Sequence, residues 1–141
     1  MLKWINKKRN RKGFTLVELV VVIAILGILA AIAVPKLSKS RENAAIAAHN
    51  ANVRTLESSA TLAVSEGSGE IIWEGKDDNK DGDFGWGNYL QSWPEVPKGL
   101  EGKTIGKDAD GNDIKINSGA KYKVIIDTNG GIKVEPGKTI E

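Results

Sequence analysis

Cysteine is absent from the 141-residue chain, and histidine occurs only once, at His49. The lack of cysteine excludes a disulfide scaffold, a zinc site with cysteine ligands and a thiol nucleophile. A single histidine argues against a Ser-His-Asp triad and against a metal site built from several histidines. We therefore expect that the chain is not an enzyme, and its length suits one domain of ordinary size.

Acidic residues are missing from the first 13 residues, which carry six of the chain's 20 Lys and Arg residues. Beyond this segment 14 cations face 18 acids, a net charge of −4 over residues 14–141. A basic nucleic-acid-binding domain is not expected, because the positive charge is confined to one end. The six cations are Lys3, Lys7, Lys8, Arg9, Arg11 and Lys12.

Charge is almost absent from the next segment, Phe14–Val34, in which Glu18 is the only charged residue among 21. As a helix this run spans about 30 Å, the thickness of a bilayer's hydrocarbon core, and the basic segment before it predicts a cytoplasmic N-terminus. A cleaved secretory signal peptide is the competing interpretation, but its apolar core is usually only ~7–15 residues long. A carboxylate within the run marks Glu18 as a functional candidate. The plainer alternative is an interfacial acid that reaches the lipid headgroups.

Residues 12–18, Lys-Gly-Phe-Thr-Leu-Val-Glu, resemble the prepilin cleavage motif of type IV pilins and their pseudopilin relatives. The resemblance covers roughly residues 7–65. It implies that a membrane-embedded prepilin peptidase cuts between Gly13 and Phe14 on the cytoplasmic side and N-methylates Phe14. The mature chain would begin at Phe14 and contain 128 residues.

Cleavage at this bond would remove six cations and create a new α-amino cation at Phe14. The resemblance implies that Glu18 of one subunit neutralises the Phe14 amine of the next subunit in a filament. The attraction between these charges grows as the local dielectric constant falls, and an unpaired buried charge is strongly unfavourable. We therefore expect the pair to fix the register of the subunits. Gly27 and Pro35 lie where pilins carry helix-weakening residues, and a kink or local break is expected there.

The predicted fold is α+β, with a small antiparallel sheet of three to four strands packed on the C-terminal half of a long N-terminal helix. We divide the chain into a leader that is removed (1–13), a transmembrane and filament-core helix (14–35), an amphipathic helix (36–66) and a head (67–141). The amphipathic part places His49 on or beside an apolar stripe, as a partly buried helix residue. That stripe contains Ile46, Val53, Leu56, Ala60 and Ala63.

The head has short strand patterns separated by turn signals. Asp110-Gly111 and Asn129-Gly130 are typical of hairpin turns. The expected strands are 70–74, 103–107, 113–117, 121–127 and 131–135. Residues 75–99 form a loop region whose expected buried anchors are Trp86, Tyr89, Leu90, Trp93 and Val96.

An acidic loop carries Asp77, Asn79 and Asp81 at alternating positions, followed by Gly82 and Asp83. Oxygen ligands at this spacing can converge on Ca²⁺, as in an EF-hand loop. Its twelfth position is Asn88 rather than the bidentate Glu, so the site is incomplete. The alternative is an exposed loop whose acids solubilise the protein. The similar residues Asp108, Asp110 and Asn112 are interpreted as a solvated hairpin turn.

The resemblance implies a type IV pilin: a structural subunit that is cleaved, methylated and polymerised into a surface pilus for adhesion, motility or DNA uptake. Before assembly it would cross the cytoplasmic membrane once, and its partners would be other copies, the peptidase and the assembly machinery. No cofactor is required by this interpretation. A minor pilin or a pseudopilin of a type II secretion or competence machine is the first alternative. A membrane-anchored calcium-binding or adhesive domain that does not polymerise is the second.

Overall fold

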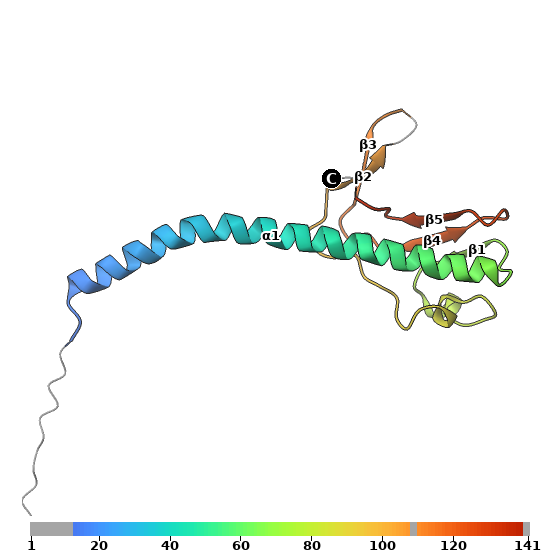
Figure 1. Cartoon of the computed structure of the whole chain (residues 1–141), viewed down its shortest axis with the longest axis horizontal. Coiled ribbons are helices and arrows are strands. Elements are labelled where there is room, and N and C mark those ends of the chain that lie inside the picture. Colours follow the sequence, from blue (N-terminus) through green and yellow to red (C-terminus); the bar gives the residue numbers. More distant parts are fainter. Residues whose placement is uncertain (1–12, 108–109, 140–141) are drawn as a thin grey trace, which may run out of the picture. The chain divides into compact units, whose positions relative to one another are not determined.

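The computed structural model of the protein describes residues 13–107 and 110–139, and these contain one long helix, five short strands and two 3-10 turns (Figure 1). They fall into two compact units, one ending at Lys39 and the other beginning at Ser40. The predicted leader up to residue 12, together with Asp108, lies outside the described residues. In chain order the elements are α1 (Leu16–Ser65), β1 (Ile71–Trp73), η1 (Asp77–Asn79), η2 (Trp86–Asn88), β2 (Thr104–Lys107), β3 (Asp113–Lys115), β4 (Lys123–Ile126) and β5 (Ile132–Glu135).

Helix α1 is 50 residues long, close to the length that the sequence predicts. Gly27 and Pro35 both lie inside it, and the helix continues through them without a break. The predicted kink therefore stays a prediction, while a local break is not found in α1. The helix ends one residue before the predicted boundary at residue 66, because Gly67 adopts a left-handed φ of 98° and the Ser68 N–H donates to the Ala63 carbonyl at 2.9 Å.

The C-terminal half of α1 buries the apolar stripe that the sequence predicts. Val53, Leu56, Ala60 and Ala63 are at most 1% exposed, whereas Ile46 is partly buried. Two alanines on this face let the sheet approach the helix closely. The stripe is therefore the helix's contribution to the core of the head.

A three-stranded antiparallel sheet supplies the facing side of the core, in the order β1-β4-β5. In the central strand β4, Val124 and Ile126 are fully buried, while Lys123 and Ile125, which alternate with them, are partly exposed. This alternation confirms that one face of the strand packs on the helix. Trp73 at the end of β1 is also fully buried.

The turn between β4 and β5 is the predicted Asn-Gly hairpin. The Asp127 carboxylate accepts hydrogen bonds from the N–H groups of Asn129 and Gly131, both at 2.8 Å. Gly130 takes a positive φ of 78°, which the sharp reversal requires.

Strands β2 and β3 form a second, two-stranded antiparallel sheet instead of extending the first. All three residues of β3 are exposed, so this hairpin does not pack its own face on the helix. The α+β architecture is confirmed, with the three-stranded sheet on the helix and the β2–β3 hairpin beside it (Figure 1). The sequence of β3 explains the difference, because Asp-Ile-Lys offers one apolar side chain.

His49 is completely buried, deeper than the sequence predicts. Its Nε2 lies 2.7 Å from the Gly137 carbonyl, and its Nδ1 lies 2.7 Å from the Tyr122 hydroxyl. A carbonyl can only accept, so Nε2 carries the hydrogen and Nδ1 accepts from Tyr122. The histidine therefore joins α1, the start of β4 and the C-terminal segment in one buried polar chain.

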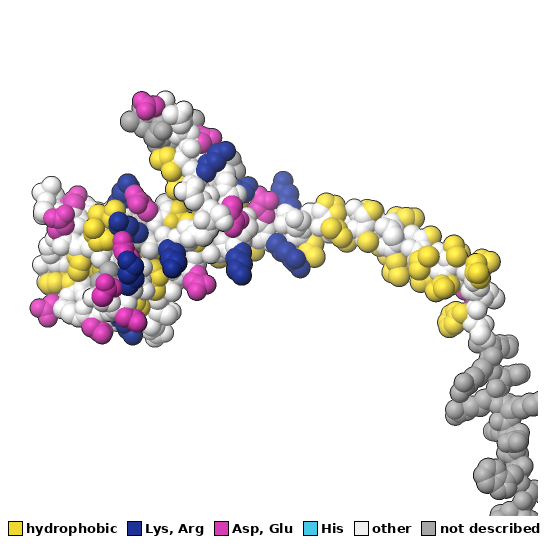
Figure 2. Space-filling view, turned by 180° about the vertical axis from the view of Figure 1, so that it is seen from behind, with side chains coloured by type: hydrophobic (Ala, Val, Ile, Leu, Met, Phe, Trp, Pro, Cys, Tyr) yellow, Lys and Arg dark blue, Asp and Glu magenta, His cyan; other side chains and the backbone are white. Residues whose placement is uncertain are grey.

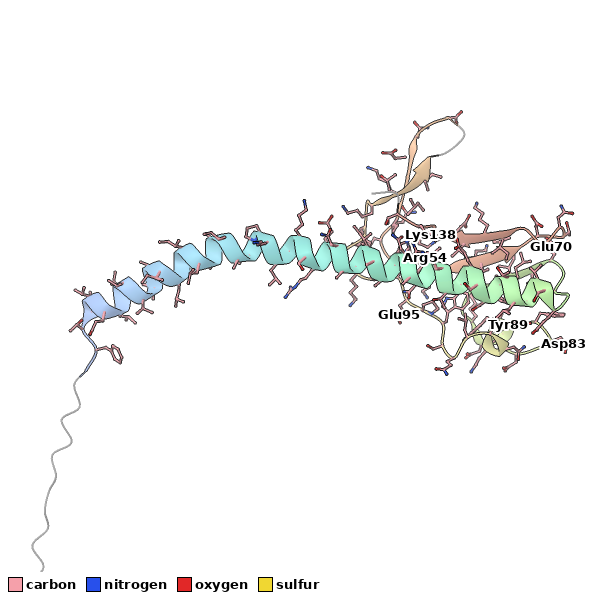
Figure 3. The ribbon with its side chains drawn as sticks, viewed as in Figure 1. Arg54, Glu70, Asp83, Tyr89, Glu95 and Lys138 are labelled. Carbon is pink, nitrogen blue, oxygen red and sulfur yellow. The ribbon has the colours of Figure 1, made fainter. Side chains whose placement is uncertain are left out.

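The C-terminal segment 137–139, which we call the strap, is fixed to α1 by further polar contacts. The Thr139 N–H donates to Asn50 Oδ1 at 2.9 Å, and Lys138 Nζ lies 2.5 Å from Glu57 Oε2. Lys138 lies beside the helix in Figure 3. Through these contacts the strap covers the edge of the core where His49 and Tyr122 lie.

In Figure 1 residues 75–99 lie below α1, while β5 lies above it. Indole groups fix this segment: Trp73 Nε1 donates to the Phe84 carbonyl at 3.0 Å, and Trp86 Nε1 donates to the Lys76 carbonyl at 3.1 Å. The predicted anchors are confirmed, since Trp86 is 5% exposed and the remaining four, Tyr89, Leu90, Trp93 and Val96, pack against the core.

Candidate functional site

The predicted cleavage bond lies directly ahead of α1. Gly13, Phe14 and Thr15 have no regular secondary structure, and helix begins at Leu16. The Phe14 side chain is 92% exposed, and a Cβ added at Gly13 would meet no atom within 4 Å. The bond between Gly13 and Phe14 is therefore not shielded by other described residues, as a peptidase substrate requires.

Glu18 is held by Thr15 in a reciprocal capping arrangement at the helix start. Its Oε2 accepts from the Thr15 N–H at 2.8 Å and from the Thr15 hydroxyl at 2.9 Å. In return the Glu18 N–H donates to Thr15 Oγ1 at 3.2 Å. This is a capping box, in which Thr at the N-cap and Glu three residues later satisfy backbone donors that the helix cannot pair.

The capping box gives Glu18 a second role, which is to stabilise the start of α1 within its own chain. Its signal is present in the sequence as Thr-x-x-Glu over residues 15–18, immediately before an apolar run. The carboxylate is thereby hydrogen-bonded to Thr15, the residue that follows Phe14, where cleavage would create an amine. The structure contains one chain, so the charge pair between two subunits stays a prediction.

Behind the capping box, the first half of α1 exposes its apolar side chains. Leu16 is 78% exposed, Ile25 is 52% and Val34 is 65%. Figure 2 shows hydrophobic side chains along the surface of this part of the helix. By length and composition α1 is able to cross a membrane. An apolar surface of this size has to be covered by lipid or by other protein chains.

The acidic loop places its predicted ligands on a short helical turn and the bend after it. Asp77 begins η1, and Gly82 has a positive φ of 113°. Asn88 closes the loop, since its side-chain amide donates to the Gly82 carbonyl at 2.6 Å and to the Asp83 carbonyl at 3.4 Å. Thus the residue at the twelfth position of the EF-hand pattern acts as a donor to the loop backbone.

Across the described residues, no group of three or more His, Asp or Glu side chains forms a cluster able to hold a metal ion. The calcium site of Asp77, Asn79, Asp81 and Asp83 stays a prediction. Its donor set is chemically suited to Ca²⁺, which prefers oxygen ligands, but other oxygens would have to complete the coordination.

Comparison with known proteins connects the capped helix to a family motif. Residues 8–34 match the prokaryotic N-terminal methylation motif. A fimbrial protein of Pseudomonas aeruginosa is 41% identical over 64 residues, which are 45% of this chain and 41% of that protein. The type IV wide pilus major component PilA4 of Thermus thermophilus is 58% identical over 36 residues, 26% of this chain and 28% of that protein.

A type II secretion system core protein G of Dickeya chrysanthemi is 28% identical over 103 residues, 67% of each chain. No solved structure matches. The chain spans less than half the length of the Pseudomonas aeruginosa fimbrial proteins that it matches. The motif and these relatives identify the N-terminal part of the chain as that of a type IV pilin or pseudopilin.

Proposed function

We propose that the protein is a type IV pilin, a structural subunit that polymerises into an extracellular filament used for adhesion, motility or DNA uptake. The observation that carries this proposal is the capped start of a 50-residue helix whose first half exposes its apolar side chains. A folded monomer gains nothing from such a surface in water. A filament subunit uses this apolar surface in two environments. It contacts lipid before assembly, and it packs against neighbouring subunits in the filament.

Processing prepares the helix for the second environment. Cleavage between Gly13 and Phe14 would remove the basic leader, which is costly to bury, and N-methylation would follow at Phe14. Glu18 of one subunit would then meet the Phe14 amine of the next. Such a pair fixes register more than it adds stability, because its attraction is offset by the cost of removing both charges from water.

The partners of this function are other copies of the chain, a prepilin peptidase that also methylates, and the assembly machinery. The precursor would cross the cytoplasmic membrane once with its N-terminus inside, and the mature protein would form a pilus on the cell surface. The role is structural, and it needs neither catalysis nor an obligatory cofactor.

The processing step is tested by the mass and N-terminal sequence of protein from sheared surface filaments. We expect a chain that begins at methylated Phe14. Gly13→Val should block cleavage, because glycine has no side chain and a branched one would clash with the peptidase at the cleavage site. Uncleaved precursor should then accumulate. Gly13→Ala is the milder control. A mature mass that is unchanged in the valine variant would refute the assignment of this bond.

A pseudopilin is the second candidate, and the similarity to the type II secretion core protein G supports it. That similarity extends over 103 residues and reaches beyond the helix into the head, as does the similarity to a fimbrial protein of Moraxella nonliquefaciens over 96 residues. The two roles differ in abundance: a major pilin would be the dominant protein band of purified filaments, and a pseudopilin would not. A membrane-anchored domain that does not polymerise would instead keep its leader and show the full precursor mass.

A further inference from the structure

A groove of about 520 Å³ runs between the β2–β3 hairpin and the β4–β5 pair. Apolar side chains from both sheets line it, including Ile105, Ile114 and Val134. Ile114 is 44% exposed, although isoleucine is usually buried. The separation of the two sheets is what creates this groove.

Lysines surround these apolar side chains. Four lysines and one glutamate line the groove. Lys133 pairs with that glutamate, Glu135, at 2.6 Å, and Lys123 lies 3.6 Å from Glu74. Lys115 and Lys121 are exposed and form no ion pair within the part of the chain that the structure describes. The groove therefore presents two uncompensated cations next to an apolar surface.

The acidic loop has the opposite character. Its two lysines are already engaged, since Lys76 pairs with Glu74 at 2.6 Å and Lys80 lies over the Trp86 ring at 5.9 Å. Asp81 and Asp83 are exposed, and neither has an ion-pair partner within residues 13–107 and 110–139. The tip of the loop thus carries two carboxylates that no cation of the described residues compensates.

The groove and the acidic loop lie on opposite flanks of the head. In Figure 1 the β2–β3 hairpin is above α1 and the loop that follows η1 is below it, and Figure 3 places Asp83 on that lower side. A subunit therefore cannot insert its own loop into its own groove. Two different surfaces that match each other build an open, repeating assembly, because every subunit offers one of each.

We propose that the lysine-lined groove of one subunit receives the acidic loop of a neighbouring copy. The incoming loop would cover Ile114 in the groove, and its Asp81 and Asp83 would approach Lys115 and Lys121. Complementary charges of this kind select orientation and exclude wrong pairings. This contact rests on the proposed filament function and adds to it a specific interface between heads, separate from the N-terminal helix.

The absence of cysteine allows a direct test by disulfide trapping in intact filaments. The full chain carrying both Asp83→Cys and Lys121→Cys should form, on mild oxidation, a ladder of covalent dimers, trimers and longer products, because each subunit bears both halves of the contact. Either single variant should give at most dimers. A matched control, Glu70→Cys with Lys121→Cys, uses another exposed acid of the head and should give no ladder.

Charge reversal provides a second test that needs no cross-link. Lys115→Glu with Lys121→Glu, or Asp81→Lys with Asp83→Lys, should lower filament yield on the order of tenfold, because like charges would then face each other across the interface. Combining all four substitutions should restore the yield. Filaments of the double-cysteine variant without a ladder, or no rescue by the fourfold variant, would overturn the proposal. Wild-type chains that form no filaments at all would instead refute the proposed function.

Discussion

At the scale of single residues, Glu18 combines two tasks that impose different chemical demands. Its carboxylate accepts two hydrogen bonds from Thr15 and so caps α1, which any acceptor at this position does. Pairing with an amine of another subunit would require a negative charge as well. The two tasks are separable by substitution, since glutamine retains the acceptor but loses the charge.

Tyr122 is the second residue whose environment has a measurable consequence. Burial raises its pKa above the ordinary value of 10.0, because the ionised phenolate would be poorly solvated. A folded-state pKa above the unfolded one means that the stabilisation is fully present below pH about 10 and is lost as pH rises through the folded-state value.

We therefore predict that the head unfolds in alkali with a steep loss of stability above pH about 10. Tyr122→Phe should remove most of this alkaline loss, because no group remains there to ionise. At neutral pH the same variant should be destabilised by about 1–3 kcal/mol, since His49 Nδ1 loses its donor in a buried site. The measurement is the free energy of unfolding of the full chain in detergent as a function of pH. Tyr89→Phe is the comparison, because burial and the Glu66 carboxylate also raise the pKa of Tyr89. A larger alkaline effect of Tyr89→Phe than of Tyr122→Phe would contradict the assignment.

At the scale of elements, the 75–99 segment shows how a loop with only two short 3-10 turns is fixed. Trp86 fills the core and donates to the Lys76 carbonyl, while Asn88 ties its amide to the Gly82 carbonyl. The Tyr89 hydroxyl reaches back to Glu66 near the end of α1 at 2.8 Å. The segment is therefore ordered by a few side chains with both apolar area and a polar group, and the acids between them remain in solvent.

For this loop we predict weak calcium binding, with a dissociation constant on the order of 10⁻⁴–10⁻³ M, as in extracellular modules. Millimolar calcium should raise the melting temperature of the full chain in detergent slightly, because an ion that binds only the folded state stabilises it. Asp77→Ala with Asp81→Ala should abolish the rise while leaving the melt in chelator nearly unchanged. If wild type melts equally in calcium and in chelator, the loop is only a solvated surface.

At the scale of the whole molecule, two kinds of surface serve two kinds of neighbour. The first half of α1 offers exposed apolar side chains, which suit lipid and other copies of the same helix. The head offers a lysine-lined groove and an acidic loop, which suit each other in water. An assembly that uses both would combine non-directional burial with directional charge contacts, so its affinity and its register would come from different surfaces.

Assembly also provides the test of Glu18. We predict that Glu18→Ala and Glu18→Gln both insert and are processed, because the leader and the apolar run are unchanged. Both should yield few filaments, since the Phe14 amine loses its charged partner. The glutamine variant retains the capping box, so its helix start should stay intact, whereas the alanine variant loses the acceptor for the Thr15 N–H and hydroxyl. Filament yield by shearing and helicity in micelles are the measurements, and a normal yield from Glu18→Gln would exclude the charge pair.

The sequence by itself determines the elements that depend on local chemistry. The apolar run, the glycine-rich helix end and the Asn-Gly turn each act through neighbouring residues, and α1, its end at Ser65 and the β4–β5 hairpin follow from them. The capping box is of the same kind, because Thr15 and Glu18 are three residues apart.

Only the tertiary structure decides how distant segments meet. His49 and Tyr122 are 73 residues apart, and nothing near either residue indicates that they share a hydrogen bond. The division of five strands into two sheets, and with it the groove between them, likewise depends on how much apolar surface each strand can place on the helix. Burial over long sequence separations is a property of the whole packed core, so local patterns cannot specify it.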